Sequence, residues 1–225
     1  MPGILYLVAT PIGNLEDITL RALKILKEVQ LIAAEDTRHT GLLLKHYGIS
    51  TPLSSFYSYN QKGKAPELIR RIQEGVNMAL VSDAGTPGIS DPAVALVTQA
   101  VAAGIKVVPI PGPTALISAL IASGLDTSQF VFTGFLPVKP GRRAKALEQL
   151  EQESRTIVIY ESPHRISRTL QELADVFKSR PAAVCREITK MFEEFERGTL
   201  PELAEKYLTK KPKGEFVIVI AGKVG

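Results

Sequence analysis

Residues 78–91, Met-Ala-Leu-Val-Ser-Asp-Ala-Gly-Thr-Pro-Gly-Ile-Ser-Asp, join an apolar run to a loop rich in small residues. The run at residues 78–82 is typical of a buried strand. Asp91 is expected to cap a helix that extends to Ala103, because Pro92 suits the first helical position. A strand, a loop and a helix in this order form part of a βαβ unit, in which consecutive strands are parallel.

The segments on either side repeat this rhythm. Apolar runs at residues 4–9, 30–34 and 106–110 predict further strands, and residues 18–29 have the periodicity of a helix. Strands that alternate with helices in this way form a parallel sheet with helices on both faces. The first half of the chain is therefore predicted to be a doubly wound α/β domain with a mostly parallel sheet.

A rigid segment at residues 108–114 separates the two halves of the chain. Its prolines lack N–H donors and restrain the backbone, so the segment ends one structural unit and directs the chain into the next. We place the domain boundary here, which gives an N-terminal domain of residues 1–111 and a C-terminal domain of residues 112–225.

The second half is expected to form a mixed α/β sheet. Predicted strands at residues 182–187 and 191–197 follow each other without a helix between them, which favours a mixed sheet. Thr199 and Glu202 have the spacing of a capping box at the start of a helix from Leu200. The other expected elements are helices at residues 114–123, 142–152 and 163–177 and strands at residues 130–133, 156–160 and 215–221.

The composition is that of a globular protein of 225 residues, 45% of them hydrophobic. The apolar stretches are shorter than the roughly 20 residues that a membrane span needs. No basic leader with a cleavage site precedes the first strand, so we expect a cytoplasmic protein without a membrane partner. Cys185 is expected to be a buried core residue, with a catalytic thiol as the alternative. A net charge of +4 permits a nucleic-acid partner but does not require one.

Three loops that follow predicted strands are candidates for ligand binding, because ligands of open α/β sheets bind at the carboxyl ends of the strands. The loop at residues 9–17 contains neither G-x-G-x-x-G nor Gly-Lys-Ser/Thr, which argues against NAD and nucleoside triphosphates; a tight turn explains it as well. In the loop at residues 82–91, small residues would let a ligand approach the backbone, although helix capping alone explains Asp91. Hinge geometry explains the loop at residues 110–116 equally well.

Polar residues follow two other predicted strands, at residues 34–39 and 162–165. They could serve catalysis or contact a polymer, although the solvated start of a helix explains them as well. A basic group at residues 139–145 also follows a strand end. The three histidines have no metal-ligand spacing with carboxylates, and no G-x-S-x-G motif occurs, so neither a metal site nor a serine hydrolase is predicted.

Together these segments resemble the tetrapyrrole-methylase superfamily and, within it, the 16S ribosomal RNA cytidine 2′-O-methyltransferases. The resemblance to the superfamily rests on the loop after the first strand, on Gly85-Thr86-Pro87 and on Pro111-Gly112-Pro113-Thr114-Ala115. The resemblance to the branch rests on segments spread over most of the chain, at residues 8–15, 34–38, 82–92, 134–137, 160–165 and 186–190.

The resemblance implies a two-domain fold that binds S-adenosylmethionine in the cleft between its domains, and a homodimer. It implies methyl transfer to the ribose 2′-hydroxyl of a cytidine in 16S ribosomal RNA of the small ribosomal subunit. At matching positions it implies that the cofactor contacts are Ile12, Ala84, Gly85, Thr86, Ile89, Thr114, Ala115, Glu161 and Ile188.

Because a ribose hydroxyl is a poor nucleophile, we expect a base or a polarising cation near it. Asp36 is the first candidate for the catalytic group, followed by Asp83, His164 and Lys190. The expected contacts to the RNA substrate are Arg38, Arg142, Arg143 and Arg165. Two alternatives remain open, a methylase of a corrinoid or tetrapyrrole precursor and a non-catalytic RNA-binding assembly factor.

Overall fold

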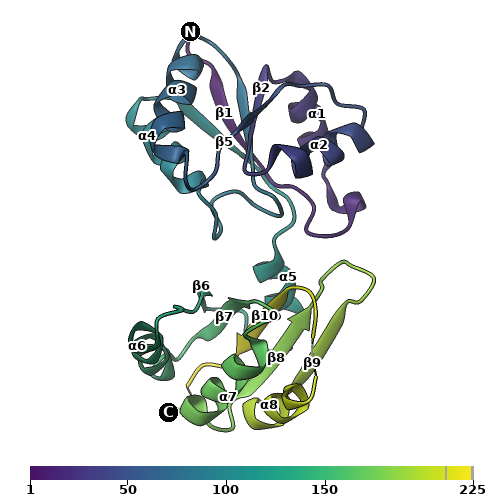
Figure 1. The fold of residues 1–225 in the computed structure, drawn as a ribbon, viewed down its shortest axis with the longest axis vertical. Coiled ribbons are helices and arrows are strands. Elements are labelled where there is room, and N and C mark those ends of the chain that lie inside the picture. Colours follow the sequence, from purple (N-terminus) through teal and green to yellow (C-terminus); the bar gives the residue numbers. More distant parts are fainter. Residues whose placement is uncertain (211, 224–225) are drawn as a thin grey trace. The chain divides into compact units, whose positions relative to one another are not determined.

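The computed structural model describes residues 1–210 and 212–223 (Figure 1). The chain divides into two compact units, Met1–Thr114 and Ala115–Gly225, and each unit has its own sheet and its own core. Among the described residues, no helix has the length and apolar character that crossing a membrane would require.

The first unit is a five-stranded sheet in the order β3-β2-β4-β1-β5, and all of its neighbouring strands are parallel. This confirms the predicted doubly wound parallel sheet. Its strands are β1 (Ile4–Val8), β2 (Leu31–Ala34), β3 (Leu53–Ser55), β4 (Met78–Val81) and β5 (Lys106–Ile110). Its helices are the short 3-10 helix η1 (Leu15–Asp17) and α1 (Leu20–Glu28), α2 (Thr37–His46), α3 (Gln61–Gln73) and α4 (Ala93–Ala102).

Helices cover both faces of this sheet (Figure 1). Leu26 of α1 and Leu44 of α2 pack on one face, in the same cluster as Ile32 of the sheet. Leu68 of α3 and Leu96 of α4 pack on the other face. β2 and β4 are buried along their whole length, as expected of central strands in a sheet that is covered on both sides.

The second unit contains the predicted mixed sheet, in the order β6-β7-β10-β8-β9. Only β6 and β7 are parallel; the other neighbouring strands are antiparallel. Its strands are β6 (Phe130–Phe135), β7 (Thr156–Glu161), β8 (Pro181–Arg186), β9 (Glu194–Thr199) and β10 (Phe216–Ile220), and its helices are α5 (Ala115–Ala122), α6 (Pro140–Glu151), α7 (Ile166–Phe177) and α8 (Leu200–Leu208).

The two faces of this second sheet are covered differently. Leu147 of α6, Leu173 of α7 and Leu203 of α8 share one core with inward-facing strand residues. On the opposite face α5 packs against β7 and β10, and its Leu116 N–H donates to the Tyr160 hydroxyl group at 3.2 Å. Cys185 of β8 is fully buried, and burial raises the pKa of its thiol to about 12, as expected of a core cysteine.

Capping residues and prolines in the sequence predicted where most of the helices begin. The Thr199 and Glu202 capping box at the start of α8 is confirmed. The carboxylate of Asp91 accepts a hydrogen bond from the Ala93 N–H, although Pro92 occupies the N-cap position of α4. One predicted start was wrong: α7 begins at Ile166 rather than Pro163, because the residues after Ser162 form a turn.

Candidate active site

The three small-residue loops of the first unit meet at the carboxyl ends of β1, β4 and β5, which are neighbours in the sheet. Thr10 and Gly85 exchange two backbone hydrogen bonds, of 2.9 and 3.0 Å. The Thr86 hydroxyl group donates to the Pro113 carbonyl oxygen at 3.1 Å. Because these bonds join the loops directly, the loops form one continuous backbone surface at this edge of the sheet.

Gly85 and Gly112 lie where the loops approach each other closely. The φ of Gly85, +82°, is in the left-handed region that favours glycine. A Cβ atom on Gly85 would lie 3.2 Å from Ile12 Cγ2 and 3.6 Å from the Pro113 carbonyl oxygen. A Cβ atom on Gly112 would lie 2.8 Å from the Ala9 Cβ atom. At Gly112 a Cβ atom would therefore force a neighbour to move, whereas at Gly85 it would strain the backbone and need only a small shift of the Ile12 side chain.

Five of the predicted cofactor contacts belong to this group of loops, and a sixth, Thr114, follows directly on Pro113. Ile12 is buried against Gly85, whereas Thr86 is half-buried and Ala84 and Ile89 are exposed. The structure thus brings together Ile12, Ala84, Gly85, Thr86, Ile89 and Thr114 within the first unit. The small, accessible residues of the loop at residues 82–91 suit a ligand that approaches the backbone closely.

Asp36 begins α2, at the carboxyl end of β2. Its carboxylate accepts a hydrogen bond from the Arg38 N–H at 2.8 Å and is paired with the Arg38 guanidinium group at 2.8 and 3.2 Å. These bonds hold the pKa of Asp36 well below its usual range. Asp36 is therefore a weak proton acceptor, and Arg38, whose side chain is 91% exposed, extends into solvent.

Glu35 has the opposite electrostatic environment. Its pKa is raised, mainly by burial and then by the negative charges of Asp83 and Asp91, although the Asp83 N–H donates a hydrogen bond to its carboxyl group. Asp83 in turn accepts a hydrogen bond from the Asp36 N–H at 2.9 Å. Glu35 therefore lies against the loop at residues 82–91. Its raised pKa is typical of a carboxylate that accepts a proton.

Sequence reasoning missed Glu35. The available signal was its position directly after the buried strand β2, but that position also applies to Asp36. Only the contacts distinguish the two carboxylates, because Arg38 neutralises one of them and Asp83 and Asp91 repel the charge on the other.

Glu161 ends β7 in the second unit, and its side chain is completely buried. One carboxylate oxygen accepts hydrogen bonds from the Ser162 N–H at 2.7 Å and the Arg165 Nε at 2.8 Å. The other oxygen accepts from the Thr169 hydroxyl group at 2.7 Å. The carboxylate is thus fully used inside the unit, which leaves only backbone atoms for the predicted cofactor contact.

Arg143 does not occupy a position that suits the predicted RNA contact. The residue is only 4% exposed; its guanidinium group donates to Thr169 at 2.7 Å and is paired with Glu172. Arg142, its neighbour on α6, is exposed. Arg165 is part of the Glu161 network and also donates to the Leu136 carbonyl oxygen at 3.3 Å. Because Arg143 is a buried structural cation, we correct its predicted role.

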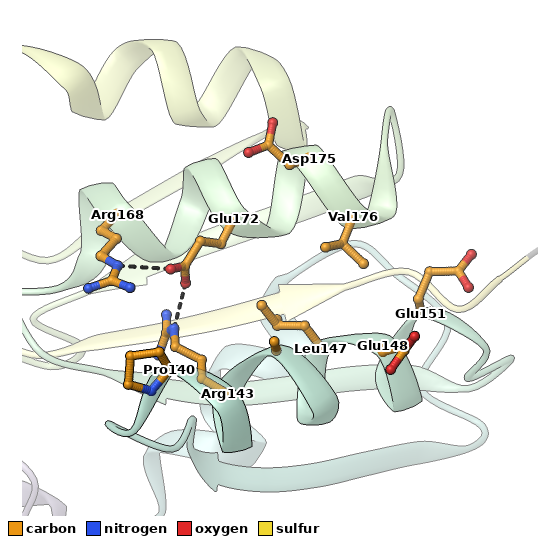
Figure 2. A pocket seen from close by; sticks show the side chains of 10 residues that line it. Pro140, Arg143, Leu147, Glu148, Glu151, Arg168, Glu172, Asp175 and Val176 are labelled. Carbon is orange, nitrogen blue, oxygen red and sulfur yellow. Dashed lines mark hydrogen bonds and ion pairs between the residues drawn. The ribbon is translucent and has the colours of Figure 1, made fainter.

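A groove of about 650 Å³ separates α6 from α7 in the same unit (Figure 2). Figure 2 shows Arg143 and Arg168 on either side of Glu172, with Leu147 and Val176 further along the groove. Of the predicted site residues, Arg143 alone lines it. The groove is therefore distinct from the loops of the first unit that carry the predicted cofactor contacts.

The remaining predicted residues lie in the second unit. His164 is exposed in the turn before α7. Burial lowers the pKa of Lys190, but its hydrogen bonds to Glu215 and Glu187 outweigh burial and raise it, so Lys190 is a cation rather than a base. Ile188 is buried between Glu187 and Thr189, which both have positive φ angles. Ala115 begins α5.

Within residues 1–210 and 212–223, no group of histidine, cysteine and acidic residues is arranged to hold a metal ion.

Residues 4–204 match the family model of the Tetrapyrrole (Corrin/Porphyrin) Methylases. The chain belongs to this family. The resemblance inferred from the loop sequences is thereby confirmed.

Curated relatives of this tetrapyrrole methylase agree with it over nearly its whole length. A protein of Synechocystis sp. is 55% identical over 221 residues, which are 98% of this chain and 79% of the relative. A protein of Halalkalibacterium halodurans is 50% identical, over 98% of this chain and 76% of the relative. A protein of Escherichia coli O157:H7 is 49% identical, over 98% of this chain and 78% of the relative. All three bear the name ribosomal RNA small subunit methyltransferase I.

Three solved structures share the fold. Cobalt precorrin-4 methyltransferase gives a TM-score of 0.71 at 18% identity, with 96% of this chain and 94% of the other covered. Uroporphyrin-III-C-methyltransferase from Thermus thermophilus gives 0.66 at 21% identity, with the same coverage. Diphthine synthase gives 0.74 at 15% identity, with 99% of this chain and 91% of the other covered. At these identities the similarity establishes the two-sheet α/β fold and not the substrate.

Proposed function

We propose that this tetrapyrrole methylase transfers a methyl group from S-adenosylmethionine to the ribose 2′-hydroxyl of a cytidine in 16S ribosomal RNA. The observation that carries the proposal is the 49–55% identity, over 98% of the chain, with relatives named as ribosomal RNA small subunit methyltransferases. We further propose that the enzyme acts in the cytoplasm, as a homodimer, on the RNA or on the small ribosomal subunit.

The loops of the first unit fit the methyl donor. Gly85 is buried and bonds to Thr10 through both of its backbone groups, so it shapes the loop, and Ile12 packs against it as an apolar neighbour. Ala84, Thr86, Ile89 and Thr114 complete this part of the proposed cofactor site, and Ala115, Glu161 and Ile188 remain proposed contacts from the second unit. Bound S-adenosylmethionine supplies a methyl group that its sulfonium charge activates for nucleophilic attack.

Glu35 is the best-placed proton acceptor among the carboxylates of this edge. Asp36 is neutralised by Arg38, and Asp91 accepts hydrogen bonds from Gly88 N–H and Ala93 N–H, both at 2.8 Å. A raised pKa makes the Glu35 carboxylate a stronger base than an ordinary glutamate, which favours removal of the proton of an attacking hydroxyl group. Asp83 positions Glu35 through its own N–H.

The test is to incubate the protein with methyl-labelled S-adenosylmethionine and, separately, naked 16S RNA, assembled small subunits and a corrinoid precursor, and then to map the label. The proposal expects label on a ribose 2′-oxygen of the RNA. Label in the macrocycle alone would contradict it. Binding of RNA without any binding of S-adenosylmethionine would instead indicate a non-catalytic assembly factor.

A further inference from the structure

The turn that follows β8 has a rare backbone conformation. Residues 187–190, which we call the Ile188 turn, begin the connection from β8 to β9 (Figure 1). Glu187 has a φ of +49° and Thr189 a φ of +70°, so both lie in the left-handed region that favours glycine. For the β-branched Thr189 this conformation is especially unfavourable. Because such residues lie on both sides of Ile188, the turn keeps this shape only where its surroundings hold it.

Hydrogen bonds fix the backbone on both sides of Ile188. The Glu187 N–H donates to the Glu215 carbonyl oxygen at 3.0 Å, and the Thr189 N–H donates to the Glu193 carboxylate at 2.6 Å. Among the described residues, in contrast, none accepts a hydrogen bond from the Ile188 N–H or donates one to the Ile188 carbonyl oxygen. The turn thus leaves the backbone groups of a proposed cofactor contact unbonded, while bonds to its neighbours fix their orientation.

Lys190 joins the Ile188 turn to the segment that precedes β10. Its N–H donates to the Glu187 carbonyl oxygen at 2.9 Å. Its Nζ lies 2.9 Å from the Glu187 carboxylate and 2.8 Å from the Glu215 carboxylate, and its side chain is only 28% exposed. The Glu187 carboxylate also accepts a hydrogen bond from the Glu215 N–H at 3.0 Å. Without the ammonium group two negative charges would repel each other here, so we expect the turn to relax.

Two carboxylate partners alone do not distinguish Lys190 from other lysines of the second unit. Lys210 follows α8 and is paired with Glu196 and, at 3.8 Å, with Glu194. Both of these partners belong to β9, in which no residue has a positive φ angle and none is a proposed cofactor contact. What distinguishes Lys190 is therefore the strained turn that its ion pairs hold, and Lys210 provides a matched control.

We propose that Lys190 is a positioning residue, which holds the Ile188 turn in the strained shape that presents its backbone to S-adenosylmethionine. Strained backbone concentrates at binding sites, where a contact that is ordered in advance costs less to form. The Thr189 hydroxyl oxygen, buried without a hydrogen-bond partner in the described part of the chain, is a second unfavourable feature of this turn. A catalytic cation would instead act on the attacking hydroxyl group. The inference rests on the proposed function, because its ligand is the proposed methyl donor.

The experiment compares cofactor binding by variants of the full chain. Lys190→Met removes the ammonium group but keeps an unbranched side chain, and Lys190→Arg restores a cation that can bond to both carboxylates. The control variant, Lys210→Met, removes a lysine that also has two carboxylate partners. Calorimetry gives the Kd of S-adenosylmethionine without RNA, and methylation of 16S RNA gives kcat and the KM for the cofactor. Urea unfolding followed by circular dichroism shows that each variant folds and measures its stability.

Loss of the ion pairs should weaken binding of the methyl donor more than it slows the chemical step. For Lys190→Met we expect the Kd and the KM for S-adenosylmethionine to rise about tenfold and kcat to change by less than about twofold, because the lost interaction affects the bound cofactor equally before and in the transition state. Lys190→Arg should return the Kd to within about threefold of the unmodified protein. Lys210→Met should leave the Kd unchanged, even where its stability falls as far as that of Lys190→Met.

The results separate this inference from the proposed function. An unchanged Kd in Lys190→Met would overturn the inference while leaving methyl transfer to RNA intact. A lower kcat with an unchanged Kd would overturn it in favour of a catalytic role for Lys190. An equal rise of the Kd in Lys210→Met would overturn it as well, because a general loss of stability would then explain both variants. Failure of the unmodified protein to bind S-adenosylmethionine would contradict the proposed function itself.

Discussion

Glu35 and Asp36 are neighbours in the sequence, yet their carboxyl groups have opposite electrostatic surroundings. We expect Glu35→Gln to slow methyl transfer by about 10²–10⁴-fold, the usual contribution of a positioned base. Asp36→Asn should have a smaller effect, because asparagine still caps α2. Initial rates with labelled S-adenosylmethionine test this, with calorimetry to show that both variants bind the cofactor. An active Glu35→Gln beside an inactive Asp36→Asn would reverse the assignment.

The raised pKa of Glu35 predicts how the reaction depends on pH. A base must be unprotonated, so the rate should fall as the pH drops through a pKa above the usual 4.5 of a glutamate. Asp91→Asn removes a negative neighbour and should lower the Glu35 pKa, which moves the fall in rate to lower pH. A pH profile measures the rate, and a ¹³C NMR titration of the Glu35 carboxyl group measures the pKa without substrate. If the rate falls at the same pH in Asp91→Asn as in the unmodified protein, Asp91 does not raise the pKa of Glu35.

Gly85 and Gly48 allow steric crowding to be separated from backbone strain. Both have positive φ angles, of +82° and +62°, but a Cβ atom meets Ile12 only at Gly85, whereas Gly48 has no neighbour within 4 Å. Alanine at either position should lower the free energy of unfolding by about 1–2 kcal/mol through backbone strain. Only Gly85→Ala should also weaken binding of S-adenosylmethionine. Urea unfolding and calorimetry give the two quantities, and equal cofactor affinities in both variants would refute the proposed contact.

At the scale of single elements, α6 carries two adjacent arginines with different roles. Arg143 is buried and bonds to Thr169 and Glu172 of α7, whereas Arg142 is exposed. Arg143→Ala should lower the free energy of unfolding by about 1–3 kcal/mol, because it removes the partner of the buried Thr169 hydroxyl group and leaves Glu172 paired with Arg168 alone. Arg142→Ala should lower it by less than about 0.5 kcal/mol. Chemical denaturation tests both, and similar values would mean that the network contributes little stability.

Composition could not have distinguished these two arginines. Both lie in the same basic run, and the buried one becomes evident only once α7 packs beside α6 and places Thr169 and Glu172 within reach. The same limit applies to Glu161, whose partners are on its own strand end and on α7. In contrast, the close contact of the loops around Gly85 could be predicted, because glycine in a loop indicates that another segment approaches its backbone closely.

The strands and helices were largely predictable, because in most of them the apolar residues recur over enough positions to show a period. β4, α5 and β10 lie within about a residue of their predicted bounds at each end. β3 was not predicted, because it has only three half-buried residues at the edge of its sheet. Such a strand is defined by its pairing with β2 and not by a pattern of its own.

At the scale of the whole molecule, each unit has its own hydrophobic core and its own sheet. The first sheet is parallel, and its strand ends carry the loops proposed to bind the methyl donor. The second sheet is mixed, and its helices α6, α7 and α8 share one core with the strands. Family membership covers both units, because the matched residues extend from 4 to 204.

Cys185 allows local unfolding of the second unit to be followed by the rate at which its thiol is labelled. It is the only cysteine in the sequence and is fully buried in β8, between β9 and β10. A thiol-reactive dye cannot reach it in the native protein, so labelling requires β8 to become exposed. The labelling rate at increasing urea concentrations should therefore follow the opening equilibrium of this sheet alone. The protein thus contains a natural probe that reports the stability of one sheet without an engineered label.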